Sequence, residues 1–173
     1  RLDRDTFGIV LLAKNAHIHG ILNQFHTEGK IQKAYHALVF GGPESDTGII
    51  DAPIARRPLP SLLRYVNQEG KPSRTEFTVL ERKEGITKLA LRPVTGRTHQ
   101  LRVHCAHMGY PILGDPQYGS ESSHMHSAKL GLTSQLLCAK SLSFPHPITG
   151  KQMNLSSELD AEIKNERIKG SLV

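Results

Sequence analysis

Residues 92–108, with the sequence RPVTGRTHQLRVHCAHM, form a dense set of possible anion-binding groups. The segment contains three arginines and three histidines but no aspartate or glutamate, and the next acidic residue is Asp115. Arg97 directly follows a glycine at a predicted strand-to-helix junction, where backbone N–H groups without helical partners can bind an anion. The segment therefore predicts a site for a phosphate, for a carboxylate from a distant part of the chain, or for both. A solvated basic loop capped by Thr98 would have the same composition.

The candidate carboxylate is Asp3, which lies in the sequence RLDRDTFG. An isolated aspartate in such a sequence is usually a turn residue or a helix cap, so its spacing alone assigns it no chemical role. An ionised aspartate held next to an arginine could, however, act as a nucleophile or as a base.

A metal site is the alternative use of the same segment. His104 and His107 are three residues apart and could face the same way on a helix, but no carboxylate partner or HExxH pattern accompanies them. The sequence therefore predicts no metal, and these side chains are expected to cap, pack or contact phosphate. The full set of candidate ligands is His99, His104, Cys105, His107, His124 and His126.

Length and composition favour one soluble domain with a polyanionic partner. The chain has 173 residues and a net charge of +6, and a basic protein of this size favours an acidic partner such as nucleic acid. No apolar run approaches the roughly 18 residues of a membrane span, and no secretory signal is present. Cys105 and Cys138 lie in apolar surroundings without CxxC spacing, which predicts buried free thiols in a reducing cytoplasm.

The elements that must position these residues can be read from apolar periodicity. Residues 9–13 form a continuous apolar run, predicted to be a buried strand. Asn15 is predicted to cap a helix that ends at Gly29, with an apolar stripe at Ile18, Ile21, Leu22 and Phe25. Residues 33–40 alternate as a strand, with Tyr35, Ala37 and Val39 on one face and His36, Leu38 and Phe40 on the other.

The rest of the chain mixes strands and helices without regular βαβ alternation. This pattern predicts an α+β fold with a largely antiparallel sheet. The expected elements are an irregular segment at 43–74, a strand pair at 75–80 and 86–91, a helix at 98–108 capped by Thr98, a polar loop at 119–129, a strand at 136–144 and an amphipathic helix from 156.

Four motifs, taken together, resemble the catalytic domain of the RluA-type pseudouridine synthases. They are RLDRDTFG, KAYHALVFG, LRPVTGRTHQLRVHCAHMGYPILGDPQYG and LCAKSLSFPHP, in this order, and the resemblance extends from residue 1 to about residue 150. It implies a long, bent, mainly antiparallel sheet flanked by helices, with the active site in a cleft across the sheet. It also implies one catalytic domain over residues 1–173 that lacks the leading segment usual before RLD in this family. Phe7 replaces the small hydroxyl residue usual at its position.

The resemblance carries specific roles to individual residues. Asp3 resembles the catalytic aspartate, Tyr35 the active-site tyrosine, and Arg97 the basic residue that pairs with the aspartate. Leu101 resembles the apolar residue that lines the uracil pocket, and Thr6 and Gly8 match the turn that positions the aspartate. The substrate-binding set expected from the resemblance and from the basic segments is Leu101, Arg102, Thr6, Gly8, His99, Arg56, Arg57 and Arg64.

The implied reaction exchanges the N1–C1′ bond of a uridine for a C5–C1′ bond. It is redox-neutral, so neither a cofactor nor a metal is expected. Arg97 would keep Asp3 ionised through a direct ion pair, since a contacting arginine lowers the pKa of an aspartate by roughly 1–3 units. The ring of Tyr35 would receive the uracil once it has left its stack.

The expected partner is a structured RNA, either ribosomal or transfer RNA, bound by a monomeric cytoplasmic enzyme without membrane contact. The remaining donors around Arg97 and Arg102, with the basic segment at 56–74, would hold the RNA phosphates. A non-catalytic RNA-binding module that uses the same basic cleft is the alternative.

Overall fold

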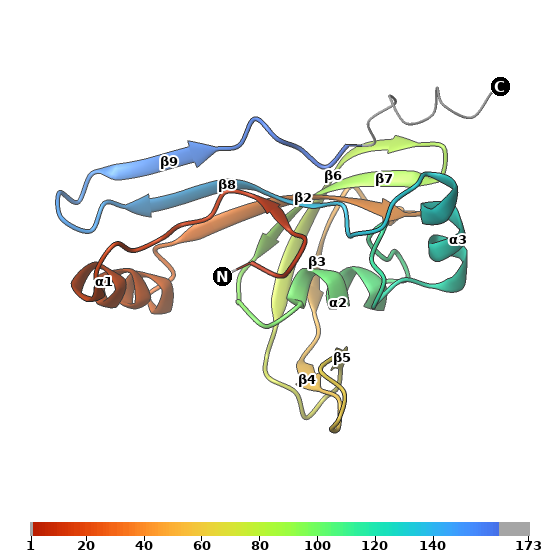
Figure 1. The fold of residues 1–173 in the computed structure, drawn as a ribbon, viewed down its shortest axis with the longest axis horizontal. Coiled ribbons are helices and arrows are strands. Elements are labelled where there is room, and N and C mark those ends of the chain that lie inside the picture. The colour runs from red at the N-terminus through yellow and green to blue at the C-terminus, as the bar shows by residue number, and fades with distance from the viewer. Residues whose placement is uncertain (1, 163–173) are drawn as a thin grey trace.

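A seven-stranded sheet forms the body of the protein (Figure 1). The structure is a computed structural model that describes residues 2–162. The strand order is β1-β8-β2-β7-β6-β3, and β9 pairs with residues 141–145 of β8, beyond the residues that pair with β1. Within the described residues only β1 and β8 pair in parallel, so the predicted α+β class with a mainly antiparallel sheet is confirmed. The strands are β1 Phe7–Gly8, β2 Gln32–Phe40, β3 Thr47–Asp51, β6 Arg74–Lys83, β7 Ile86–Pro93, β8 Leu137–Pro145 and β9 Gln152–Ser156.

Within residues 2–162, three helices and a small hairpin accompany the sheet. Figure 1 shows α1, α2 and the hairpin on one side of the strands, α3 at the end of β2 and β7, and residues 157–162 on the other side. The hairpin pairs β4 with β5 in a separate two-stranded sheet and projects away from the body. The bounds are α1 Ala16–Thr27, α2 Gln100–His107, α3 Glu121–Lys129, β4 Ile54–Arg56 and β5 Arg64–Val66.

The central strand β2 contributes to a core on each face of the sheet, and the predicted alternation divides its side chains between the two faces. Tyr35, Ala37 and Val39 belong to the large core that also contains side chains of α2. Leu38 and Phe40 belong to a second cluster on the opposite face. Burial of apolar side chains on both faces stabilises the sheet by about 1.5–3 kcal/mol for each large residue. The register of β2 is therefore strongly specified, because a one-residue slip would exchange the two faces.

The helix predicted after residue 15 is confirmed. Asn15 caps α1, and its side-chain oxygen accepts a hydrogen bond of 2.9 Å from the N–H of Ile18. The apolar stripe of α1 packs with Leu142 of β8 in a third core cluster. This packing holds α1 at the end of the sheet where β8 and β9 lie (Figure 1).

The prediction of a buried strand at residues 9–13 is wrong. Ile9 and Leu11 pack into the third cluster, but Val10 and Leu12 are exposed. The segment is extended without being a sheet strand, so only alternate side chains reach the core. A continuous apolar run did not reveal this one-sided packing.

Two predictions between the main motifs are also wrong. The segment at 43–74 contains β3, which pairs with β6, and the hairpin of β4 and β5. Residues 119–129 contain α3, capped by Ser120, whose hydroxyl accepts from the N–H of Ser123. Short strands and a helix rich in serine and histidine carry too little apolar periodicity to be recognised, because tertiary pairing stabilises them.

The helix predicted from residue 156 is not present in the described part of the tail. Ser156 ends β9, residues 157–162 are not helical, and residues 163–173 lie outside the described residues. Instead, Asp160 accepts hydrogen bonds from Lys88 at 2.9 Å and from His36 at 2.8 Å. Lys140 lies 3.7 Å from the same carboxylate. Three neighbouring strands thus supply the basic groups that fasten this segment to the sheet.

The pKa of Asp160 reflects this arrangement. Burial alone would raise the pKa, but hydrogen bonds from Lys88 and His36 and from the N–H of Ala161 lower it to about 2. A carboxyl group whose pKa is lower in the folded state stabilises the fold above its unfolded pKa, near 3.9, and loses that contribution as the pH falls toward its folded pKa.

We expect Asp160→Asn to lower the free energy of unfolding at pH 7 by about 2 kcal/mol, because it removes the carboxylate charge that pairs with Lys88 and accepts from His36. The difference from wild type should shrink as the pH falls from about 4 toward 2. Urea unfolding followed by circular dichroism measures both effects. Asp46→Asn is the matched control, since the carboxylate of Asp46 is 79% exposed in its pair with Arg82. Equal losses in the two variants would contradict the assignment.

Candidate active site

A cleft of about 470 Å³ brings together residues that are far apart in the sequence. Asp3 comes from the turn before β1, Tyr35 from β2, and Leu101 from α2. Arg97 and His99 come from the connection between β7 and α2. The cleft therefore contains all three residues expected to be catalytic. Further basic residues that line it are His26, Lys33, Arg74 and Arg92.

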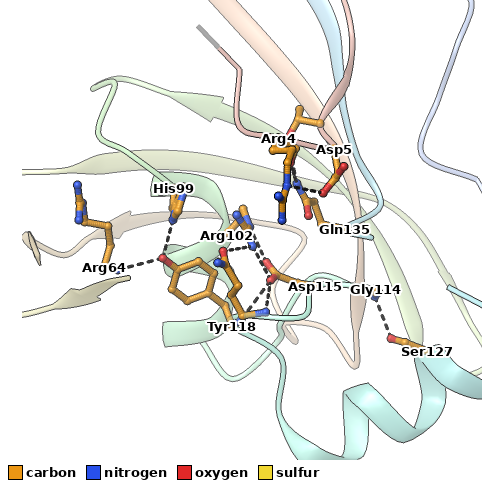
Figure 2. A network of polar contacts seen from close by, with 12 residues as sticks. Arg4, Asp5, Arg64, His99, Arg102, Gly114, Asp115, Tyr118, Ser127 and Gln135 are labelled. Atoms are coloured by element: carbon orange, nitrogen blue, oxygen red, sulfur yellow. Dashed lines mark hydrogen bonds and ion pairs between the residues drawn. The ribbon is translucent and has the colours of Figure 1, made fainter. Parts of the chain in front are cut away.

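A tight turn followed by β1 positions Asp3. The carbonyl of Asp3 accepts a hydrogen bond of 3.1 Å from the N–H of Thr6, and the side chain of Gln135 donates to the carbonyl of Arg4 at 2.6 Å (Figure 2). Gly8 has φ +104°, and a Cβ there would overlap the carbonyl oxygen of Ala139 in β8. Gly8 thus permits the close parallel pairing that anchors the turn.

Phe7 is the first residue of β1, and its side chain faces away from the cleft. It packs with Leu38, Leu113 and Cys138 in the cluster on the opposite face of the sheet from Tyr35. The larger side chain at this position is therefore accommodated in the core and does not enter the cleft.

Tyr35 faces the cleft from the middle of the sheet, as predicted. Its side chain is largely buried in the core beneath Leu101, yet it lines the same cleft as Asp3. Burial raises the pKa of Tyr35, and the charge of Asp3 raises it further. The hydroxyl therefore keeps its proton at neutral pH and remains a hydrogen-bond donor.

The predicted direct ion pair between Arg97 and Asp3 is wrong for this structure. Arg97 is exposed, and its Nε donates to the carbonyl of Pro72 at 3.1 Å. The buried side chain of Gln100 fixes the backbone here, because it accepts from the N–H of Arg97 at 3.0 Å and from the hydroxyl of Thr95 at 2.7 Å. Arg97 and Asp3 share the cleft without a salt bridge between them.

The expected role of Arg102 in phosphate binding is also corrected. Its side chain is only 4% exposed, and two of its nitrogens each donate to Asp115 at 2.7 Å (Figure 2). Burial would lower the pKa of the Arg102 guanidinium, but the hydrogen bonds and charge of Asp115 raise it, so the guanidinium stays charged. Arg102 is thus a structural partner of Asp115 and cannot reach an RNA phosphate at the surface.

His99 begins α2 in a left-handed conformation, with φ +57°. It occupies the N-cap position that was predicted for Thr98. Its Nδ1 lies 2.7 Å from the hydroxyl of Tyr118, and the two rings meet edge to face (Figure 2). Burial lowers the pKa of His99, partly opposed by the charge of Asp3, so the ring is neutral at pH 7.

Two of the other candidate metal ligands, His104 and Cys105, are buried in the core. His104 is buried, with its ring nitrogens hydrogen-bonded to Thr75 and to the carbonyl of Ala52. Cys105 and Cys138 are buried free thiols, as predicted, and burial raises the pKa of Cys105 to about 12. Across residues 2–162, no three histidine, cysteine or acidic side chains are grouped to hold a metal ion.

Three basic residues of the segment at 56–74, Arg56, Arg57 and Arg64, lie on the projecting hairpin of β4 and β5 (Figure 1). Arg56 and Arg57 are exposed, and the guanidinium of Arg57 lies 5.3 Å from the ring centre of Tyr65. Arg64 is half-buried at the start of β5. None of these three residues lines the cleft itself. They form a separate basic arm that extends from it.

Comparison with known proteins identifies the family. The model of the family described as RNA pseudouridylate synthase matches residues 1–107. The chain belongs to this family. The match confirms the resemblance found in the four motifs, and the observed fold agrees with it.

Individual relatives agree with this assignment. The chain is 42% identical over 174 residues to a ribosomal large subunit pseudouridine synthase C of Pasteurella multocida, covering 99% of the chain and 53% of that protein. It is 43% identical over 157 residues to an uncharacterized RNA pseudouridine synthase of Aquifex aeolicus, covering 88% and 50%. The chain thus spans about half the length of these curated relatives.

A solved structure shares the fold. The human RNA pseudouridylate synthase domain containing 1 superposes with a TM-score of 0.79 at 29% identity, covering 92% of this chain and 67% of that one. Within the described residues, none of the helices has the length and apolar character needed to cross a membrane.

Sequence reasoning missed Asp115 and Tyr118 as parts of the site. Both lie in GDPQYG, at the end of the third motif, but no role was assigned to them. Asp115 pairs with Arg102 and also accepts from the N–H groups of Gln117 and Tyr118. The absence of any other acidic residue near the basic segment was the signal that could have identified Asp115 as its partner.

We expect Asp115→Ala to lower the free energy of unfolding by about 3–5 kcal/mol, because it leaves the charge of Arg102 buried without its partner. Asp51→Ala is the matched control, since its pair with Arg74 is largely exposed and should contribute less than about 1 kcal/mol. Urea denaturation of both variants tests the difference. A loss for Asp115→Ala no larger than for the control would show that the buried pair is not a major stabilising contact.

Proposed function

We propose that this protein isomerises uridine to pseudouridine in structured RNA. The observation that carries the proposal is the convergence of Asp3 and Tyr35 in one cleft of a chain that belongs to this family. Residues 1–173 are proposed to act as a single catalytic domain of a monomeric cytoplasmic enzyme.

The proposed chemistry uses one carboxylate and needs no redox partner. The N1–C1′ bond of the uridine breaks, the uracil turns, and a C5–C1′ bond forms, while one proton leaves C5 and N1 gains one. Asp3 acts either as the nucleophile or as the base in this sequence. Tyr35 offers a ring face for the displaced uracil and a protonated hydroxyl, and Leu101 packs beside it.

Arg97 is proposed to join the reaction when RNA is bound. In this structure its guanidinium has one hydrogen bond to a backbone carbonyl at the rim of the cleft, so it can turn toward Asp3 or toward a phosphate at little cost. Either contact would place a positive charge near the reacting carboxylate and would help to keep it ionised.

The RNA is proposed to lie across the cleft and along the basic arm. Arg56 and Arg57 are exposed on the hairpin, while Lys33, Arg74 and Arg92 line the cleft. Contacts to the phosphate backbone would supply most of the affinity and make binding salt-dependent. The names of the bacterial relatives favour ribosomal RNA of the large subunit as the substrate over transfer RNA.

We expect Asp3→Asn to abolish pseudouridine formation, because an amide can be neither the nucleophile nor the base. RNA binding should be retained, since the basic arm is unchanged. The measurement is pseudouridine content in large-subunit ribosomal RNA incubated with the intact protein, together with RNA affinity by filter binding.

Asp5→Asn is the control for this experiment. Asp5 belongs to the same turn and has φ +68°, a conformation that asparagine tolerates, and its carboxylate is exposed beside Arg4. It should retain full activity. A wild-type protein that binds RNA without modifying it would instead support the non-catalytic alternative, and activity in Asp3→Asn would exclude Asp3 as the catalytic group.

Two variants of Tyr35 distinguish the contribution of its ring to activity from that of its hydroxyl. Tyr35→Ala removes both, and stacking of a base on an aromatic ring contributes about 1–3 kcal/mol, so turnover should fall by at least about fivefold. Tyr35→Phe keeps the stacking face and should lose activity mainly if the hydroxyl transfers a proton. The measurement is the single-turnover rate of each variant, at a temperature where circular dichroism shows that all variants are folded. Equal activity of Tyr35→Ala and wild type would remove Tyr35 from the site.

A further inference from the structure

We propose that Tyr118 is a positioning residue whose hydroxyl links the basic hairpin to His99 and fixes which ring nitrogen of His99 faces the substrate. The inference rests on the proposed function, because it concerns the same cleft. Tyr118 does not line the cleft itself, so it would act through His99.

The hydroxyl of Tyr118 joins two parts of the protein that are far apart in sequence. It accepts a hydrogen bond of 3.0 Å from the backbone N–H of Arg64, at the start of β5 in the hairpin. It also lies 2.7 Å from Nδ1 of His99, which lines the cleft with Asp3. Figure 2 shows both contacts meeting at the same oxygen.

The donors and acceptors at this oxygen determine the protonation of His99. A backbone N–H can only donate, so Arg64 uses a lone pair of the hydroxyl, whose own hydrogen remains available. Burial raises the pKa of Tyr118, which keeps that hydrogen in place, and burial lowers the pKa of His99, which keeps the ring neutral. Within residues 2–162 the Tyr118 hydroxyl has no other acceptor, so we assign its hydrogen to the bond with Nδ1 and the ring hydrogen of His99 to Nε2.

The second ring nitrogen is available to a substrate. Within residues 2–162, Nε2 of His99 has no hydrogen-bonding partner, although the side chain lines the cleft beside Asp3. With its hydrogen on Nε2, His99 is a neutral donor suited to a carboxylate, a phosphate oxygen or a ribose hydroxyl. The opposite tautomer would present an acceptor to these groups and would repel the anionic ones.

The buried ion pair holds Tyr118 in the orientation that this role requires. Asp115 accepts from the N–H of Tyr118 at 3.1 Å, and the guanidinium of Arg102 lies 4.9 Å from the centre of its ring. The ring also meets His99 edge to face at 5.6 Å between centroids. The position of the Tyr118 hydroxyl is thus fixed by contacts with Asp115, Arg102 and His99.

This arrangement couples RNA binding to the geometry of the cleft. The hairpin carries the exposed Arg56 and Arg57 that are proposed to contact phosphates, and its β5 strand is tied to Tyr118 through Arg64. A shift of the hairpin on RNA binding would be transmitted through one hydroxyl to the ring of His99. Specific RNA could thereby align the donor of His99 with the reacting nucleotide.

The first test is Tyr118→Phe, which removes the hydroxyl and keeps the ring next to Arg102. We expect kcat to fall about five- to tenfold, as for one lost hydrogen bond, with a smaller change in KM, because the arginines that contact RNA remain. Tyr65→Phe is the matched control, since its hydroxyl bonds only to Asn67 within the hairpin. It should leave kcat unchanged. An unchanged kcat for Tyr118→Phe in an active enzyme would overturn the proposal.

The second test asks whether Tyr118 acts through His99. If it does, Tyr118→Phe combined with His99→Gln should be no slower than His99→Gln alone, because the contact is already lost. Multiplied losses in kcat would show that Tyr118 acts independently and would overturn the proposal.

A spectroscopic test does not depend on activity. Long-range ¹H–¹⁵N correlation spectra of the histidine rings should show Nδ1 of His99 unprotonated and Nε2 protonated in wild type, and a mixture of tautomers in Tyr118→Phe. A proton on Nδ1 in wild type, or an unchanged tautomer in the variant, would overturn the proposal. If wild type forms no pseudouridine, the proposed function fails, while these spectra still decide whether Tyr118 fixes His99.

Discussion

The buried ion pair of Arg102 and Asp115 is the contact on which the cleft depends. It joins α2 to the loop at 115–118, and the same carboxylate caps that loop by accepting backbone N–H groups. An ionised pair in the core is stable only when its hydrogen bonds are satisfied, and Gln117 accepts a further bond from Arg102 at 2.9 Å. The N-terminal end of α2, which presents His99 and Leu101 to the cleft, is therefore fixed relative to Tyr118.

The two faces of the sheet differ in what covers them. One face, beneath α2, carries Tyr35 and the cleft, and its core continues from the reacting residues into the apolar interior. The opposite face is covered in part by the segment at 157–161, which Asp160 ties to three strands and whose Ala161 is fully buried. Strand alternation makes this division possible, because neighbouring residues of β2 face opposite layers.

The electrostatics of the cleft differ from a simple pairing of one aspartate with one arginine. The charge of Asp3 raises the pKa of Tyr35 and opposes the fall in the pKa of His99, so both groups are within its electrostatic reach. Arg97, by contrast, lies at the rim with its guanidinium on a backbone carbonyl. Asp3 therefore shares the cleft with a protonated tyrosine and a neutral histidine, and no salt bridge holds Arg97 to it in this structure.

The family, the fold class and the elements with clear local signals could all be predicted from the sequence. The alternation of β2, the cap of α1 at Asn15 and the pairing of β6 with β7 all follow from periodicity and turn residues within a few positions. β3 and α3 could not be predicted in this way, because their stability comes from partners distant in sequence. The pairing of arginines with carboxylates could not be predicted either. Arg97 and Arg102 carry the same group five residues apart, and only packing buries Arg102 against Asp115 and leaves Arg97 exposed.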